Sequence, residues 1–252
     1  FVLITNGIDT RVIDTISKKD LSEKNIGIQS KFWKNGCKLS SKDELKYRYE
    51  ALTKFIGYSY DNLKLFSKSQ IEDRMSVLKG NKNDLTKKYI PELFLKNKKL
   101  YCTVEKYLIS SDVVFSIIGE SGAGKTNHMC YLAENISSKY LTLFFSGANI
   151  YRPIIEEIKE DFNWIFSPNL DPHEIFNRLS YLASINKTKV IIFIDAIDEI
   201  PFQDSINDLS DLCRKVKKYP NIKLCISCKT NEWEKFLEVR GVPSALEESL
   251  YK

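Results

Sequence analysis

A glycine-rich turn stands between an apolar run and an amphipathic segment near the middle of the chain. Residues 119–126 are Gly-Glu-Ser-Gly-Ala-Gly-Lys-Thr and match the pattern G-x-x-x-x-G-K-[ST]. Glycine permits backbone conformations that a Cβ opposes, so successive N–H groups can turn inward around an anion. Residues 113–118 predict a buried strand before the turn, and residues 125–138 predict a helix after it. This order of strand, loop and helix predicts a phosphate-binding loop.

The side chains at the end of this loop have the chemistry that a bound nucleoside triphosphate needs. Lys125 can reach the β- and γ-phosphate oxygens as a point charge, so we predict both a binding and a catalytic role for it. The Thr126 hydroxyl can bind Mg²⁺ beside them, and the positive end of the helix adds to the attraction. The predicted nucleotide-binding residues of the loop are Gly119, Glu120, Ser121, Gly122, Ala123, Gly124, Lys125, Thr126 and Asn127.

A second group of residues forms the acidic end of another apolar run. Residues 189–195 predict a buried strand that ends at Asp195, and Asp198 and Glu199 follow it. An acid at the C-terminal end of a parallel strand points into the crevice where phosphates would lie, so Asp195 is predicted to bind Mg²⁺ together with Thr126. Asp198 or Glu199 can orient or deprotonate the attacking water, and we favour Glu199 as the catalytic residue.

A third element is the apolar run at residues 222–227, which predicts the next strand of the same sheet. Ser227, Lys229 and Thr230 would emerge from its end near the γ-phosphate. We predict that Lys229 binds this phosphate. The alternative is an ordinary lysine that faces solvent.

These runs and residues 141–146 make four strand candidates, separated by segments with helical periodicity. Alternation of this kind predicts an α/β fold, namely the three-layer α/β/α sandwich of a P-loop NTPase with a mainly parallel sheet. A partial α/β segment precedes it. Residues 1–65 are predicted to be the C-terminal part of an N-terminal domain, residues 66–88 a polar linker, and residues 89–252 an NTPase domain that is incomplete at its C-terminus.

Composition excludes several functional classes. The net charge of +5 is too small and dispersed to indicate nucleic-acid binding. No apolar run approaches the roughly 20 residues of a membrane-spanning helix, so no membrane partner is expected. Six cysteines in apolar or helical contexts, with no charged and apolar leader, favour a reducing cytoplasm. Cys225 and Cys228 form a C-x-x-C pair, but the chain has no second such pair and only two histidines, which disfavours a metal or redox site.

With these elements the chain resembles the STAND class of P-loop NTPases, and within it the NACHT-type domains of immune receptors and bacterial antiphage (Avs-like) proteins. The resemblance covers about residues 89–240, and its most specific part is the strand end Asp-Ala-Ile-Asp-Glu at 195–199. It implies ATP or ADP with Mg²⁺ as cofactors, and slow hydrolysis. It also implies a switch that forms homo-oligomers on sensing a target, here expected to be a protein. Related members usually have Arg where this chain has Lys229, and lysine lacks the bidentate geometry of arginine.

The resemblance also extends to two segments outside the three motifs. Residues 89–94 resemble the segment that packs near the adenine in such proteins. STAND proteins often carry an effector such as a nuclease at the N-terminal side, which would bring a nucleic-acid partner, although residues 1–65 show no complete catalytic set. Two alternatives share the same motifs: an AAA+-like or helicase-like motor acting on nucleic acid, and a module that holds nucleotide only as a structural cofactor.

Overall fold

The computed structural model describes residues 2–5, 10–13, 60–84, 86–165, 171–201, 204–239 and 241–251. The chain divides into two compact units, Phe1–Thr53 and Lys54–Lys252. The described part of the first unit is an antiparallel pair of strands, β1 (Val2–Thr5) and β2 (Thr10–Ile13). The sequence of residues 41–56 also predicts a helix, but these residues lie outside the described part of the chain.

The second unit is built on a parallel sheet with the strand order β3-β6-β5-β4. Its strands are β3 (Val114–Gly119), β4 (Leu141–Ser146), β5 (Val190–Asp195) and β6 (Ile222–Lys229). They agree with the four predicted runs to within two residues at each end. Gly119 is in register with Lys229, and Ser146 with Asp195, so the loop and the acids meet at the carboxyl edge of the sheet. Strand β6 separates β3 from β5.

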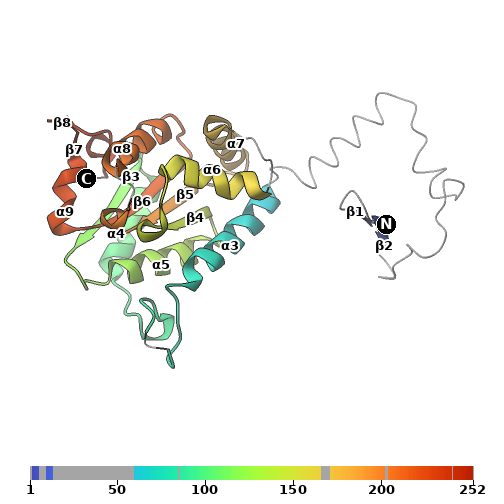
Figure 1. The fold of residues 1–252 in the computed structure, drawn as a ribbon, viewed down its shortest axis with the longest axis horizontal. Coiled ribbons are helices and arrows are strands. Elements are labelled where there is room, and N and C mark those ends of the chain that lie inside the picture. Colours follow the sequence, from blue (N-terminus) through green and yellow to red (C-terminus); the bar gives the residue numbers. More distant parts are fainter. Residues whose placement is uncertain are drawn as a thin grey trace, which may run out of the picture. The chain divides into compact units, whose positions relative to one another are not determined.

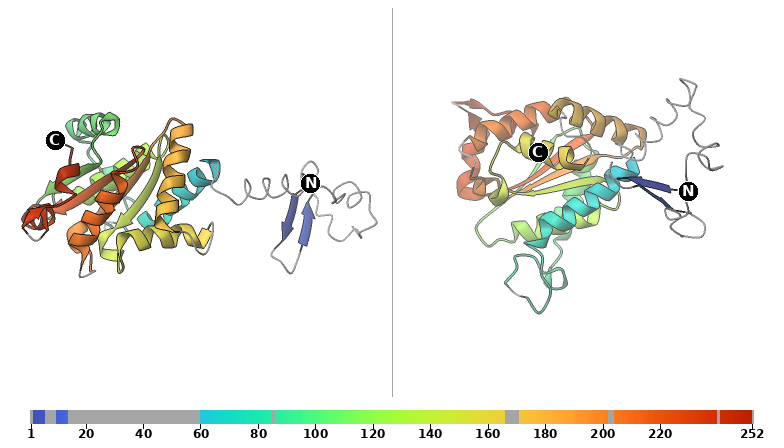
Figure 2. Two further views of the ribbon diagram at one scale, coloured as in Figure 1. Left: turned by 90° about the horizontal axis from the view of Figure 1, so that it is seen from above. Right: turned by 45° about the vertical axis from the view of Figure 1, so that its right-hand side comes forward.

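Helices cover both faces of this sheet (Figures 1 and 2). On one face, Ile192 and Ile194 of β5 belong to the core that includes α6, α7 and α8. On the other face, Ile191 and Phe193 pack with α4 and α5. The helices are α3 (Tyr60–Ser76), α4 (Lys98–Ile109), α5 (Lys125–Ile136), α6 (Ile154–Ile165), α7 (Pro172–Ile185), α8 (Ser205–Val216) and α9 (Thr230–Leu237). The predicted three-layer P-loop NTPase fold is therefore confirmed.

The structure differs from the predicted linker at residues 66–88. Residues 60–76 form α3, which lies along strand β4 at the edge of the sheet (Figure 1). Ser67 and Gln70 are polar but buried, because their side chains hydrogen-bond to the backbone of β4. Composition could not show this, since polar residues usually indicate solvent exposure. Residues 77–97 connect α3 to α4, and this connection projects from the body of the unit (Figure 1).

Short elements complete the second unit. They are η1 (Pro91–Leu93), η2 (Gly147–Asn149), η3 (Ile197–Glu199), η4 (Glu247–Ser249) and the antiparallel pair β7 (Glu238–Val239) and β8 (Val242–Pro243). The amide of Tyr251 donates to the carbonyl of Val114 at 2.8 Å, so the last described residues lie against the β3 edge. In the part of the chain that the structure describes, no helix is both long and apolar enough to cross a membrane.

Candidate nucleotide-binding site

The loop between β3 and α5 has the backbone that its glycines predict. Gly122 and Gly124 have φ angles of 80° and 79°, in the left-handed region that side chains with a Cβ rarely adopt. Gly124 is also the N-cap of α5, where no side chain accepts a hydrogen bond from the first turn. Helices α4 and α7, in contrast, are capped by Asn97 and Asp171. The first N–H groups of α5 are therefore free of a side-chain cap, which suits an anion at this helix end.

Lys125 and Asn127 lie at the start of α5. The Lys125 ammonium donates to the carbonyl oxygens of Gly119 at 2.8 Å and Glu120 at 2.9 Å, so it is folded back over its own loop. The Asn127 Oδ1 atom is buried and finds no donor among the described residues. A buried acceptor without a partner is costly, and a bound ligand or its water would relieve that cost.

Asp195 lies at the end of β5, and only 2% of its surface is exposed. Ser227 Oγ donates to Asp195 Oδ1 at 2.6 Å and accepts the amide of Ala196 at 2.8 Å. Burial raises the pKa of Asp195, while hydrogen bonds from Ser227 and Thr126 act in the opposite direction. The contact with Thr126 brings together the two residues that the sequence predicts to hold Mg²⁺. A buried carboxylate favours a nearby cation, because the cation compensates for lost solvation.

The next residue, Ala196, has a left-handed backbone with φ of 55°. This turn moves its carbonyl toward Gly147, where a Cβ would come within 2.1 Å of the Ala196 oxygen. Glycine at position 147 is therefore required by the turn that follows Asp195. No local signal in the sequence identifies this pair, because the two residues are far apart in the chain.

The two acids that follow β5 have different surroundings. The Asp198 side chain is 1% exposed and accepts the Lys229 amide at 3.1 Å, and the Lys229 ammonium lies 2.9 Å from its other oxygen. Burial favours its neutral form, but these bonds hold the pKa of Asp198 below its ordinary value. The Glu199 side chain is 34% exposed and pairs with Lys229 at 3.2 Å and with Lys88 at 3.9 Å. Hydrogen bonds to both acids raise the pKa of Lys229.

A cavity of about 300 Å³ joins these groups. Its lining comes from the loop, the start of α5, the turn after β5 and the end of β6, and it also includes Lys88. Asp195, Gly119, Glu120 and Ala123 are not among the residues that line it. The predicted residues that line the cavity are Ser121, Gly122, Gly124, Lys125, Thr126, Asn127, Asp198, Glu199, Ser227 and Lys229. Lys88, which lies in the predicted linker, also lines the cavity and is not among the predicted site residues.

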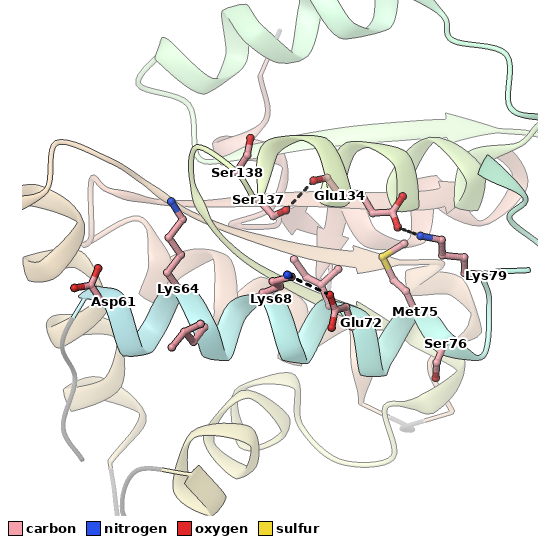
Figure 3. Close-up of a pocket in the computed structure, with 12 residues that line it drawn as sticks. Asp61, Lys64, Lys68, Glu72, Met75, Ser76, Lys79, Glu134, Ser137 and Ser138 are labelled. Carbon is pink, nitrogen blue, oxygen red and sulfur yellow. Dashed lines mark hydrogen bonds and ion pairs between the residues drawn. The ribbon is translucent and has the colours of Figure 1, made fainter. Parts of the chain in front are cut away.

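A larger hollow of about 790 Å³ lies elsewhere, between α3 and the end of α5 (Figure 3). Met75 and Ile71 give it an apolar wall, and the ion pairs of Lys68 with Glu72 and of Lys79 with Glu134 lie along it. No glycine is among the residues that line it. The smaller cavity is thus the one with chemistry suited to phosphate.

Residues 89–94, predicted to lie near the adenine, run beside α5. The Tyr89 hydroxyl donates to Glu134 Oε2 at 2.9 Å. The centre of the Phe94 ring lies 5.1 Å from that of the His128 ring and 4.8 Å from that of the Tyr131 ring. Burial lowers the pKa of His128, which favours its neutral form. The segment therefore contacts the helix that begins at the phosphate loop. A base site there remains a prediction.

Cys225 and Cys228 are both free and buried in β6. Burial is the largest cause that raises the pKa of each thiol. Among the described residues, no group of three or more histidine, cysteine or acidic side chains could hold a metal ion. The Mg²⁺ site proposed below does not require such a group, because phosphates and water supply most of its ligands.

The glycine loop, the parallel sheet and the acidic end of β5 define the P-loop NTPase fold. No family model matches the sequence, and a search of curated proteins finds no match. Among solved structures, Cdc6p from Pyrobaculum aerophilum is 18% identical with a TM-score of 0.42, over 61% of this chain and 42% of that one. The ORC2 protein of Aeropyrum pernix, in ADPNP–ADP complexes, is 15% identical with a TM-score of 0.46, over 58% of this chain and 44% of that one.

Drosophila ORC bound to DNA is 12% identical with a TM-score of 0.37, over 77% of this chain and 93% of that one. The chain spans less than half the length of the Pyrobaculum and Aeropyrum proteins. At TM-scores below 0.5 these likenesses do not bear on function, and the class follows from the chain's own loop, strand order and acids.

Proposed function

We propose that the chain binds ATP with Mg²⁺ at residues 119–127 and hydrolyses it slowly, as a regulatory switch. The observation that carries this proposal is the convergence on one cavity of the glycine loop, the Thr126–Asp195 contact and the Glu199 carboxylate. These groups come from two separate parts of the chain, the loop with the start of α5 and the segment at the end of β5. Their chemistry matches the three needs of phosphoryl transfer: a cradle for phosphates, a place for the metal and a base for water.

The residues present fit ATP and Mg²⁺. The uncapped start of α5 and the unpartnered Asn127 Oδ1 leave polar groups available to a ligand. The Thr126 hydroxyl and the Asp195 carboxylate, directly or through water, would hold Mg²⁺, which when bound neutralises charge on the phosphates. Lys125 would leave the carbonyls of Gly119 and Glu120 for phosphate oxygens, because a charged acceptor binds an ammonium more strongly than a carbonyl does.

The surroundings of the two acids favour Glu199 over Asp198 as the base. Asp198 is buried and held by both the amide and the ammonium of Lys229, so it is suited to position that lysine. Glu199 is partly exposed and lines the cavity, where a water molecule can reach it. Its ion pairs with Lys88 and Lys229 hold the side chain at the wall of the cavity.

Two substitutions test nucleotide binding and hydrolysis separately. We expect Lys125→Ala to weaken binding of Mg·ATP about 100-fold in calorimetric titration, because charge-assisted bonds to phosphate are lost. We expect Glu199→Gln to leave binding within about twofold but to slow single-turnover hydrolysis at least ~100-fold. Lys106→Ala on the exposed face of α4 is the matched control for loss of a positive charge. Normal ATP affinity in Lys125→Ala would contradict the proposal.

The switch itself is proposed from the sequence resemblance to STAND and NACHT proteins. In this proposal ADP holds a closed state. ATP, on sensing of a protein target, allows homo-oligomers to form and activates an effector in antiviral defence. The effector would lie in the N-terminal domain, and a nuclease there would bring nucleic acid as its substrate. Only a difference in affinity between the two nucleotide states can drive such a change.

The motor alternative predicts different kinetics from the switch. A switch should show slow turnover that nucleic acid does not stimulate, whereas a motor should turn over continuously and faster when polymer is added. Steady-state hydrolysis with and without DNA or RNA, measured beside sedimentation with ADP and with a non-hydrolysable ATP analogue, distinguishes them. Strong stimulation by polymer would reject the switch, and a lack of any single-turnover hydrolysis would favour a module that only binds nucleotide.

A further inference from the structure

Lys88 contributes a positive charge to the phosphate cavity from outside the loop and the sheet. It belongs to the connection between α3 and α4, and its side chain lines the same cavity as Lys125 and Lys229. Its ammonium lies 3.9 Å from Glu199 Oε2. Lys88 is therefore on the side of the cavity where the acids lie.

The backbone at Lys88 is fixed by its neighbour, whereas its side chain is largely exposed to solvent. Tyr89 is 1% exposed and its hydroxyl is bonded to Glu134 of α5. Its amide donates to the Leu78 carbonyl at 2.9 Å, and its carbonyl accepts the Gly80 amide at 2.8 Å. The Lys88 side chain is 58% exposed. A lysine anchored at its backbone and exposed along its side chain can change partners when an anion enters the cavity.

The groups that line the cavity indicate which anion this would be. The loop and the start of α5 contribute to the lining, and their amides suit the first phosphates of a nucleotide. The Glu199 carboxylate, the proposed base, must lie near the terminal phosphate that water attacks. A cation paired with Glu199 is then close to that terminal phosphate too.

We propose that Lys88 binds the terminal phosphate of a bound nucleoside triphosphate, so that it distinguishes the triphosphate from the diphosphate. This inference rests on the proposed nucleotide site. The terminal phosphate carries more negative charge than a single carboxylate, so it draws the ammonium away from Glu199. Glu199 then keeps only Lys229 as a partner. Because Lys88 lies outside the sheet, its movement also links the phosphate to the connection between α3 and α4.

The test compares two nucleotides on matched variants of the full chain. Calorimetric titrations with Mg·ADP and with a Mg-bound, non-hydrolysable ATP analogue are made on wild type, Lys88→Met, Lys88→Arg and Lys87→Met. Lys87 is the matched control, since it is adjacent but its ammonium donates to the Val77 carbonyl at 3.2 Å, away from the cavity. We expect Lys88→Met to weaken the analogue about tenfold and ADP less than twofold. Lys88→Arg should retain most of the affinity, and Lys87→Met all of it.

Each other outcome has a definite meaning. Equal loss of both nucleotides in Lys88→Met would indicate a structural role and overturn the inference, as would no loss of either. Failure of Lys88→Arg to restore binding of the analogue would also reject a charge contact. If wild type binds neither nucleotide, the proposed function itself fails and the inference with it. Because the Lys88 side chain is mostly exposed, all variants should keep the wild-type melting temperature.

Discussion

Lys223 is a charged residue in the interior of the second unit, with 2% of its surface exposed. Its ammonium donates to the carbonyl oxygens of Ser110 at 2.9 Å and Asp112 at 2.5 Å, and it lies 4.7 Å from the centre of the Tyr107 ring. It therefore joins the start of β6 to the turn between α4 and β3. Burial, and then the charge of Lys189, lower the pKa of Lys223 to about 8. Lys223 thus places a charged group at the end of the sheet opposite the phosphate loop. Its burial costs desolvation energy, which its hydrogen bonds to two carbonyls offset in part.

The lowered pKa of Lys223 makes stability depend on pH in a definite direction. Between about pH 8 and its ordinary value of 10.5, the unfolded chain binds the proton at this site while the folded chain does not. Rising pH should therefore favour the folded state over this range. We expect the free energy of unfolding of wild type, relative to Lys223→Met, to rise across this window in urea titrations. The comparison with the variant removes the contribution of the cysteines, and a flat difference would contradict the prediction.

At the scale of elements, helix α3 occupies the place where a sheet would otherwise end in an open strand. Ser67 Oγ donates to the Thr142 carbonyl at 2.6 Å and accepts its amide at 2.9 Å. Gln70 does the same for Phe144, at 2.8 Å and 2.9 Å. Two side chains of a helix thus satisfy the outward backbone groups of β4. Open strand edges favour aggregation, so this contact protects the sheet as well as stabilising it.

Removal of the Gln70 side chain should destabilise the fold, because it breaks two hydrogen bonds to the backbone of β4. Gln70→Ala leaves a buried amide and a buried carbonyl of Phe144 without partners, so we expect the free energy of unfolding to fall by about 3 kcal/mol. Lys68→Ala on the exposed side of the same helix is the control, since its ion pair with Glu72 is exposed and should cost at most ~0.5 kcal/mol. Denaturant unfolding of both variants measures this difference. If both variants lower the free energy of unfolding equally, the hydrogen bonds between α3 and β4 do not stabilise the fold.

At the scale of the whole molecule, the boundary between the two compact units falls between Thr53 and Lys54. All the residues of the proposed site, Lys88 included, belong to the second unit, as does the helix that completes its sheet. The second unit also has its own core on both faces of the sheet. It contains what a folding domain with a nucleotide site needs.

Removal of residues 1–53 should therefore leave the second unit folded and able to bind nucleotide. We expect the shortened chain to keep its melting temperature within about 3 °C and its affinity for Mg·ADP within about twofold. A chain shortened further, to begin after Ser76, lacks α3 and should unfold at much lower temperature, because β4 loses its partner. If the two shortened chains behave alike, the boundary lies elsewhere.

The sequence alone determined the phosphate loop, the four strands and the acids at the end of β5. These features are local: the loop is eight consecutive residues, and buried parallel strands are short apolar runs with recognisable ends. It also placed Thr126 and Asp195 together, because parallel strands bring their carboxyl ends to one edge. The prediction that Lys229 emerges near the γ-phosphate followed from the same rule, whereas its pairing with Asp198 and Glu199 is seen only in the structure.

Only the tertiary structure decided which lysines, acids and polar residues act together. Ser67 and Gln70 look like linker residues until β4 supplies backbone partners more than 70 positions away. Asp198 and Glu199 have the same charge and adjacent positions, and the structure distinguishes them by the burial of Asp198 and by the pairing of Glu199 with Lys88. Lys88 gains its role from a cavity formed by later parts of the chain. Such contacts depend on packing between distant segments, and no periodicity or motif in a single sequence encodes them.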